Sequence, residues 1–292
     1  MNLVNKERVK SKMTSRLFMN RILQVLLWLA TMFGLVVLGI LIYRMITQGI
    51  GFLSIDFFIN FASRFADQAG IKAAIIGTLW LMAVTIPVSL ILGVGTALYL
   101  EEYAAKNRFT RLIQVNISNL AGVPSIVFGL LGLTIFVRLA EMGRSVLAGG
   151  YTLSLLILPV IVVASQEAIR SVPKEMRDAS FAMGATKWQT IRRVVLPAAI
   201  PGILTGSILA FSRAIGETAP LIVVGALTYV AFLPESVFSG FTAMPIQIYN
   251  WVTRPQVEFQ QLAAAGIIVL LVMLIILNSI AVLIRNKFQK RY

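Results

Sequence analysis

The stretch SVPKEMRDASFAMGATKWQTIRRVVLPAAIPG, residues 171–202, is a polar interruption between two long apolar runs. Pro173 suits the start of a helix, and Gly184 suits its end because glycine accepts the left-handed conformation found there. Thr186 and Gln189 have the spacing of a capping box that opens a second helix. The pattern therefore predicts two short helices joined at a glycine.

Several apolar side chains in this stretch would face water in a plain loop. They are Met176, Phe181, Ala182, Met183 and Trp188. Apolar side chains that gather on an exposed segment indicate either a protein partner or contact with a membrane surface. Both possibilities are open for this segment, which is called the 170–198 loop below.

The rest of the chain is dominated by apolar runs. Of its 292 residues, 58% are hydrophobic and 13% are charged, whereas roughly a quarter of the residues in soluble proteins are charged. About 20 mainly apolar residues form one transmembrane helix. Six runs approach or exceed this length: 22–46, 71–100, 116–140, 151–168, 200–232 and 262–284. We expect an all-α, polytopic membrane protein with six transmembrane helices.

The runs divide the chain into a basic N-terminal arm (1–21), a first transmembrane helix (22–46), a core of five transmembrane helices with the 170–198 loop (71–284), and a basic tail (285–292). Gly122 and Pro124 interrupt the third run, and Pro159 interrupts the fourth. Gly216 and Pro220 indicate an opened helix in the fifth. Such breaks occur in membranes only where neighbouring protein or a water-filled cavity satisfies the freed backbone groups.

Positive charge is concentrated on one set of flanks. The formal net charge is +14, and 19 of the 26 Lys and Arg residues lie in the N-terminal arm, between the second and third runs, in the 170–198 loop or in the tail. Positively charged segments resist translocation, so we expect these segments and both termini to face the cytoplasm. This segregation explains the basic composition without a nucleic-acid partner.

The chain contains no Cys and no His. Thiolate nucleophiles, imidazole bases and the commonest metal ligands are therefore missing, and we expect no cofactor, no metal and no enzymatic activity. The sequence also contains no G-x-x-x-x-G-K-[ST] loop for binding ATP phosphates. An ATP-driven process would have to draw its energy from another chain.

A charged pair interrupts the fifth run. Arg213 and Glu217 lie at i and i+4, where they can face each other, and Ser212 and Thr218 flank them. A charged side chain at the membrane centre costs about 2.5 to 3.5 kcal/mol and marks a functional site by default. A guanidinium presents fixed donors to a tetrahedral oxyanion. We expect these four residues to form a substrate-translocation site, with mutual neutralisation of the pair as the alternative.

The 170–198 loop resembles the signature loop of bacterial ABC importer permeases. In that pattern Glu-Ala-Ala is followed by three residues, Gly, nine residues and Ile-x-Leu-Pro. The matching residues here are Asp178, Ala179, Ser180, Gly184, Val194, Leu196 and Pro197. Asp for Glu, Ser for Ala and Val for Ile are departures. The resemblance implies a type I importer permease fold in which this loop, Met183 included, docks in a groove of an ATPase subunit.

Three further segments resemble the PstA family of phosphate-specific permeases. They are ALYLEEYA (97–104), AGVPSIVFGL (121–130) and SRAIGETAP (212–220). The resemblance implies import of inorganic phosphate across a bacterial inner membrane, with a PstC-like second permease subunit, PstB-like ATPase subunits and a PstS-like phosphate receptor. Permeases for sulfate or molybdate share the loop motif, so another oxyanion is an alternative cargo. An ion-coupled secondary transporter is the alternative outside this family.

Two groups of polar residues lie at the ends of the predicted spans. Glu101 and Glu102, at the inner end of the second run, are expected to be solvated. Tyr249, Trp251 and Arg254 are expected to be interfacial anchors in an outward loop.

Overall fold

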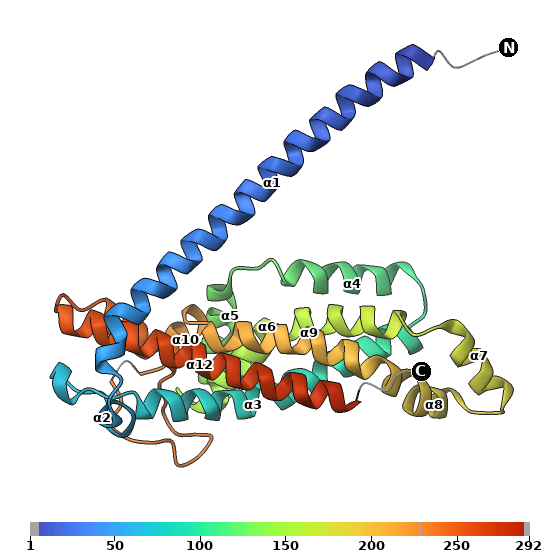
Figure 1. The fold of residues 1–292 in the computed structure, drawn as a ribbon. Helices are drawn as coiled ribbons and strands as arrows, with labels where there is room; N and C mark the ends of the chain where they lie inside the picture. Colours follow the sequence, from blue (N-terminus) through green and yellow to red (C-terminus); the bar gives the residue numbers. More distant parts are fainter. Residues whose placement is uncertain (1–5, 228, 289–292) are drawn as a thin grey trace, which may run out of the picture.

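The computed structural model describes residues 6–227 and 229–288, and every regular element within these ranges is a helix (Figure 1). The predicted all-α class is therefore confirmed. Residues 1–5 of the predicted arm, Thr228 of the fifth run and residues 289–292 of the predicted tail lie outside the described ranges.

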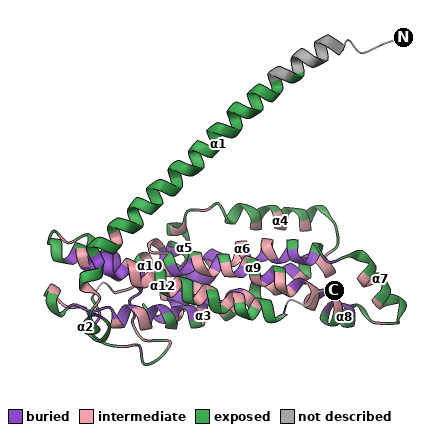
Figure 2. Cartoon of the chain, viewed as in Figure 1, coloured by how far each residue is buried: buried purple, intermediate pink, exposed green. Residues whose placement is uncertain are grey.

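Four long helices form a bundle: α3 (Lys72–Leu98), α6 (Val146–Arg170), α9 (Leu196–Gly216) and α12 (Val257–Phe288). They run side by side, and buried residues follow their facing sides (Figures 1 and 2). The shorter elements are η1 (Ile50–Phe52), α2 (Ile55–Ile59), η2 (Ala66–Gln68), η3 (Tyr99–Tyr103), α4 (Arg108–Leu120), α5 (Ser125–Gly132), η4 (Leu133–Leu139), α7 (Lys174–Ala182), α8 (Lys187–Thr190), η5 (Ile191–Val195), α10 (Ala219–Val224) and α11 (Met244–Val252).

Small residues allow α6 and α9 to pack closely. Gly202 and Gly206 of α9 face Ala168 and Ala164 of α6, and a Cβ atom on either glycine would collide with the facing alanine. Small residues four positions apart are typical of helix pairs in membranes, where close van der Waals packing replaces the hydrophobic effect. This interface therefore depends on the absence of side chains at Gly202 and Gly206 of α9.

The substitution Gly206→Val should separate α6 from α9 and lower the thermal unfolding midpoint of the purified chain in detergent. Overpacking of this kind costs roughly 1–3 kcal/mol. Gly34→Val is the matched control, because a Cβ atom added at Gly34 of α1 (Lys6–Gly49) would meet no neighbouring atom within 4 Å. Equal midpoints for the two variants would contradict the role of this contact.

Five helical segments are long and apolar enough to cross a membrane: Arg16–Phe52, Lys72–Tyr103, Val146–Arg170, Lys187–Gly216 and Val257–Lys287. A bent pair, Arg108–Leu120 with Ser125–Leu139, accounts for the sixth expected span if the two halves cross together. The described part of the chain thus agrees with five predicted spans as single helices and with one as a broken helix.

The third predicted run, 116–140, has the interruption expected at Gly122 and Pro124. It is divided between α4 and α5, and the two halves of this broken span meet at 105°. Pro124 occupies the N-cap position of α5 with ψ of 135°, so the helix cannot continue through it. The fourth run is longer than expected, since α6 begins at Val146 and contains Pro159 in its interior.

The fifth predicted run, 200–232, is wrong in its second half. Its helix α9 ends at Gly216, and the chain continues through the six-residue helix α10 to Gly225, which adopts φ of +98°. A left-handed residue ends a helix. Toward its N-terminal end the helix is longer than expected, because α8, η5 and α9 form one continuous segment from Lys187.

Helix α1 extends away from the bundle (Figure 1). Its membrane-length segment is fully exposed, as Figure 2 shows, and only its C-terminal end contacts the bundle, where Gly49 packs against the backbone of Ala264 and Ala265. Apolar side chains surround this helix on all sides. Such a surface is stable only in lipid or against another membrane protein.

Candidate functional site

The 170–198 loop forms the helical hairpin that its sequence predicts. Helix α7 has Pro173 at its N-cap, and Gly184 follows its C-terminal end with φ of +79°. A Cβ atom at Gly184 would meet open space, so the backbone conformation and not packing requires glycine here. Thr186 and Gln189 form the predicted capping box, in which the Thr186 N–H donates to Gln189 Oε1 at 2.9 Å.

The tip of the hairpin is exposed. Met183 is 88% exposed, and Phe181, Trp188, Asp178 and Ala179 are also exposed. These residues surround the turn at Gly184, at the end of the molecule where α7 and α8 lie in Figure 1. The apolar tip has no partner among the described residues, which fits a surface that binds another protein.

The base of the hairpin is attached to the bundle. Met176 packs on the cluster that contains Ile169 and Val172, so it is not one of the exposed apolar residues. The hydroxyl groups of Ser180 and Thr190 lie 2.9 Å apart and join α7 to α8. The remaining predicted loop residues, Leu196 and Pro197, are half-buried in the first turn of α9.

Arg177 connects α7 to two transmembrane helices. Its Nη1 donates to the carbonyl of Val172 at 2.6 Å, and its Nη2 donates to the carbonyl of Ile169 at 2.8 Å. Nη2 also lies 3.2 Å from Glu102 Oε1, and both side chains are largely buried. One guanidinium therefore satisfies the free carbonyls at the end of α6 and holds the acidic end of the α3–η3 segment.

A second ion pair joins α6 to η3. Arg170 binds Glu101 through two nitrogens, at 2.9 Å from Nε and 2.6 Å from Nη2, and Gln166 donates to the same carboxylate at 2.8 Å. The expectation that Glu101 and Glu102 are solvated is therefore wrong. Two carboxylates beside a strongly basic flank were the signal in the sequence that could have indicated these pairs.

Arg213 and Glu217 lie where α9 breaks. Arg213 is in the last turn of α9, and its Nε donates to Glu217 Oε1 at 3.2 Å. The Glu217 side chain is 16% exposed, whereas the Arg213 side chain is 49% exposed. The carboxylate thus holds one edge of the guanidinium. Within the described structure, the Arg213 guanidinium forms no hydrogen bond with any other residue.

Helix α10 packs back onto the bundle after the break. After Glu217, whose backbone is extended, α10 folds against α5 and α6, and its Pro220 lies against Gly129 of α5. Leu221 and Val224 are buried, and Leu221 belongs to the main cluster of the bundle. The opened helix expected from Gly216 and Pro220 is present, so Arg213 lies at a helix end and not in the middle of an intact helix.

The two flanking residues differ from the charged pair. The Ser212 hydroxyl lies 2.7 Å from Asn278 Oδ1 of α12 and 2.8 Å from the carbonyl of Ile208. Thr218 occupies the N-cap position of α10 without a capping hydrogen bond from its side chain. The structure therefore brings Arg213 and Glu217 together, and it places Ser212 in contact with α12 instead.

Trp251 is not an interfacial anchor. It is fully buried in a cluster with Phe57, whose ring centroid lies 5.8 Å from that of the indole. Tyr249 is exposed on the same helix, α11, and Arg254 stacks over the ring of Phe259 at 4.2 Å. A helix in place of the expected outward loop explains the difference, because a helix has a buried face and an exposed face.

Residues 89–291 match the model of the family described as binding-protein-dependent transport system inner membrane component. The chain belongs to this family. It is therefore a multi-pass membrane permease subunit of an ABC importer, not itself catalytic, and subunits of this kind work with an ATPase and a substrate-binding protein.

Curated relatives of this permease include a probable ABC transporter permease, YqgI, from Bacillus subtilis, which is 33% identical over 86% of the chain and 90% of the relative. The phosphate transport system permease protein PstA 1 of Mycobacterium tuberculosis is 37% identical over 76% of the chain and 72% of its own length. PstA of Haemophilus influenzae is 30% identical over 89% of the chain and 91% of its own length.

Solved structures agree with the fold of the permease. A chain of a bacterial ABC transporter that imports alginate superposes with a TM-score of 0.64 at 16% identity, over 94% of the permease and 100% of that chain. A chain of the MetNI methionine transporter superposes with a TM-score of 0.59 at 17% identity, over 73% of the permease and 95% of that chain. The type I importer fold expected from the loop motif is confirmed.

Replacement of Arg177 should loosen the hairpin without unfolding the bundle. A hydrogen bond to a charged group contributes about 1.5–3 kcal/mol, so Arg177→Gln should speed backbone amide exchange in α7 by about tenfold or more. Lys174→Gln is the control, because Lys174 is exposed on the same helix. Hydrogen–deuterium exchange with mass spectrometry measures the exchange rates of both variants. Unchanged exchange in the Arg177 variant would contradict the attachment of α7 to the bundle through Arg177.

Proposed function

We propose that this chain is one half of the translocation pathway of an ATP-driven phosphate importer. The half-exposed guanidinium of Arg213, held on one edge by Glu217 at the break between α9 and α10, is the observation that carries this proposal. The relatives named for phosphate transport support the choice of cargo. Phosphate is a tetrahedral oxyanion, and a guanidinium binds it through parallel hydrogen bonds.

The chemistry of the pair suits transient binding. Glu217 keeps Arg213 in place and partly neutralises it when no anion is present, which lowers the cost of a charge among helices. An arriving phosphate competes for the guanidinium, whose other edge is open. Thr218, at the start of α10, and Ser212, if it exchanges its contact with α12, complete the proposed site with hydroxyl donors.

The exposed tip of the 170–198 loop is the proposed contact with the ATPase. Asp178, Ala179, Met183 and Gly184 lie at the tip, and Ser180 joins the two hairpin helices at its base. Movement of an ATPase subunit would pull on α7, and the contacts of Arg177 would transmit the pull to α6 and the α3–η3 segment. Alternating access follows if the bundle responds as a rigid unit.

The partners proposed are a PstC-like second permease subunit, PstB-like ATPase subunits and a PstS-like phosphate receptor. The proposed location is the bacterial inner membrane, with both termini and the 170–198 loop in the cytoplasm, as the distribution of Lys and Arg favours. The exposed apolar side chains of α1 between Leu17 and Ile46 support contact with lipid or with a second membrane subunit.

Arg213→Gln should abolish phosphate uptake by the reconstituted importer while assembly with the ATPase stays normal. Loss of a hydrogen bond from a charged donor costs about 1.5–3 kcal/mol, which predicts at least about a tenfold decrease in uptake. Lys287→Gln is the control, because it removes an exposed positive charge at the end of α12. Undiminished uptake by the Arg213 variant would remove this residue from the pathway.

The cargo itself is tested by substrate competition in the same vesicles. Radiolabelled phosphate uptake should fall with unlabelled phosphate and stay constant with equal concentrations of sulfate or molybdate. Inhibition by sulfate or molybdate at the same concentration as phosphate would favour the other oxyanions.

Gly184→Asp should uncouple the chain from its ATPase. The carboxylate adds charge to an apolar tip, and a side chain in the left-handed conformation adds a smaller cost for Asp than for most residues, so ATP-driven uptake should fall. Gly143→Asp is a closely matched control, since Gly143 has φ of +63°, has open space around it and lies in a different loop.

Co-purification of the ATPase should weaken in the Gly184 variant and not in the Gly143 variant. If no ATPase ever accompanies the chain, and Gly184→Asp leaves uptake intact, the ion-coupled secondary transporter becomes the better explanation.

A further inference from the structure

The broken third span leaves a polar space between α4 and α6 at the end of the bundle near the 170–198 loop. A cavity of about 460 Å³ lies on one side of α4 and is lined by Lys106, Arg108, Arg111, Glu101 and Arg170 among others. A second cavity of similar volume shares Arg111, Gln114 and Arg170 with the first and extends along α6. Ligand sites typically measure roughly 300–1,000 Å³.

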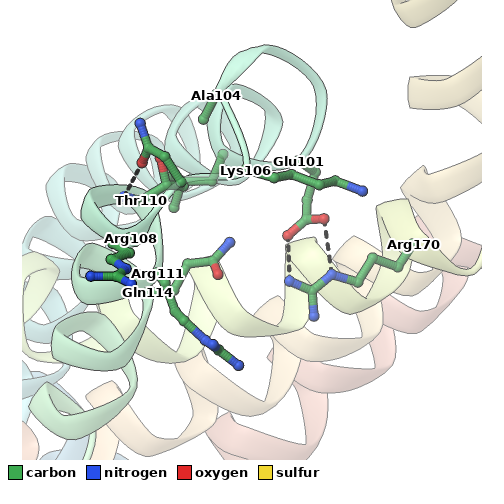
Figure 3. A pocket seen from close by; sticks show the side chains of 10 residues that line it. Glu101, Ala104, Lys106, Arg108, Thr110, Arg111, Gln114 and Arg170 are labelled. Atoms are coloured by element: carbon green, nitrogen blue, oxygen red, sulfur yellow. Dashed lines mark hydrogen bonds and ion pairs between the residues drawn. The ribbon is translucent and has the colours of Figure 1, made fainter.

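One guanidinium, that of Arg170, pairs with both carboxylates at this space. Glu101 accepts two hydrogen bonds from Arg170 and one from Gln166, and Glu167 lies 3.0 Å from the same guanidinium. In Figure 3 the Glu101–Arg170 pair faces Arg111 and Gln114 across the cavity. Arg170 is therefore occupied, and with Lys106, Arg108 and Arg111 the two linings hold four cations against two carboxylates.

Three cations on the α4 side have no counter-ion. Within the described residues, no carboxylate lies within 4.0 Å of Lys106, Arg108 or Arg111. All three line the first cavity, and in Figure 3 Lys106 lies near Glu101 and Arg111 near Gln114. The first turn of α4 also faces this space, which adds the positive end of its dipole.

We propose that this cavity binds a phosphate group, separately from Arg213. Lys106 supplies a point charge and Arg111 a planar donor pair, the combination that suits a phosphate with several oxygens. Gln114 and Thr110 add neutral hydrogen-bonding groups to the lining. The phosphate comes either from a free ion, as the last stop of transported cargo, or from the headgroup of a lipid whose chains contact the exposed Phe109 and Leu112 of α4.

The absence of native Cys permits a local test in the full-length chain. Gln114→Cys places a thiol in the shared lining, and Asn116→Cys on the same helix is the control, because Asn116 lines neither cavity. An anionic methanethiosulfonate should label Gln114→Cys about tenfold faster than a cationic one, since a basic cleft concentrates anions. Asn116→Cys should show a smaller preference.

Inorganic phosphate and vesicle composition then distinguish the two sources. In phosphatidylcholine vesicles, phosphate at roughly ten times its dissociation constant should slow labelling of Gln114→Cys about tenfold if the free ion binds. If a headgroup binds, protection should occur only in vesicles that contain phosphatidylglycerol. Either result supports the site, and Asn116→Cys should remain unprotected in both.

Neutralisation of the cations completes the test. Protection should be lost when Gln114→Cys is combined with the three substitutions Lys106→Gln, Arg108→Gln and Arg111→Gln. If that combined variant does not fold, Gln114→Cys with Arg111→Gln alone should show weaker protection. Protection that survives these changes, or no protection by either probe, would overturn the proposal. Because labelling is measured without transport, this outcome is independent of whether Arg213→Gln stops uptake.

Discussion

Lipid cannot hydrogen-bond to a peptide group, and this constraint governs the whole structure. Every regular element in the described ranges is helical, and the helices that follow the two breaks, α5 and α10, are packed against each other. Gly129 of α5 lies against Pro220 of α10, so the broken third span and the broken fifth span share one interface. Irregular backbone is tolerated in a membrane only when protein or water covers it, and the contact between α5 and α10 supplies protein beside both breaks.

The charges follow the same logic at both ends of the bundle. Near the 170–198 loop, Arg177 and Arg170 bind the two carboxylates of η3, and Arg177 also binds the carbonyls of Ile169 and Val172, which makes the hairpin part of the bundle. At the break of α9, Glu217 holds Arg213 on one edge only. Fully bonded charges thus lie at the joint between the hairpin and the bundle, and an incompletely bonded charge lies at the break of α9.

Much of the fold could be predicted from the sequence because it depends on local chemistry. Apolar run length set the number of spans, and Gly184, Thr186 and Gln189 defined the hairpin through backbone conformation and capping. The fifth run was wrong in its second half, and the direction of the third was not predicted, because hydropathy measures composition and not direction. A run that turns by 105° at Pro124 has the same average as a straight one.

What the sequence by itself determined is the type of solvent, the helices and the hairpin, together with the presence of Arg213 and Glu217 in an apolar segment, since these follow from residues close together in the chain. What only the tertiary structure decided is which distant groups meet. Glu101 and Arg170 are far apart in sequence, as are Ser212 and Asn278. Trp251 lies in the core and not at the surface. Long-range contacts depend on the relative placement of whole helices, and that placement results from packing over the entire bundle.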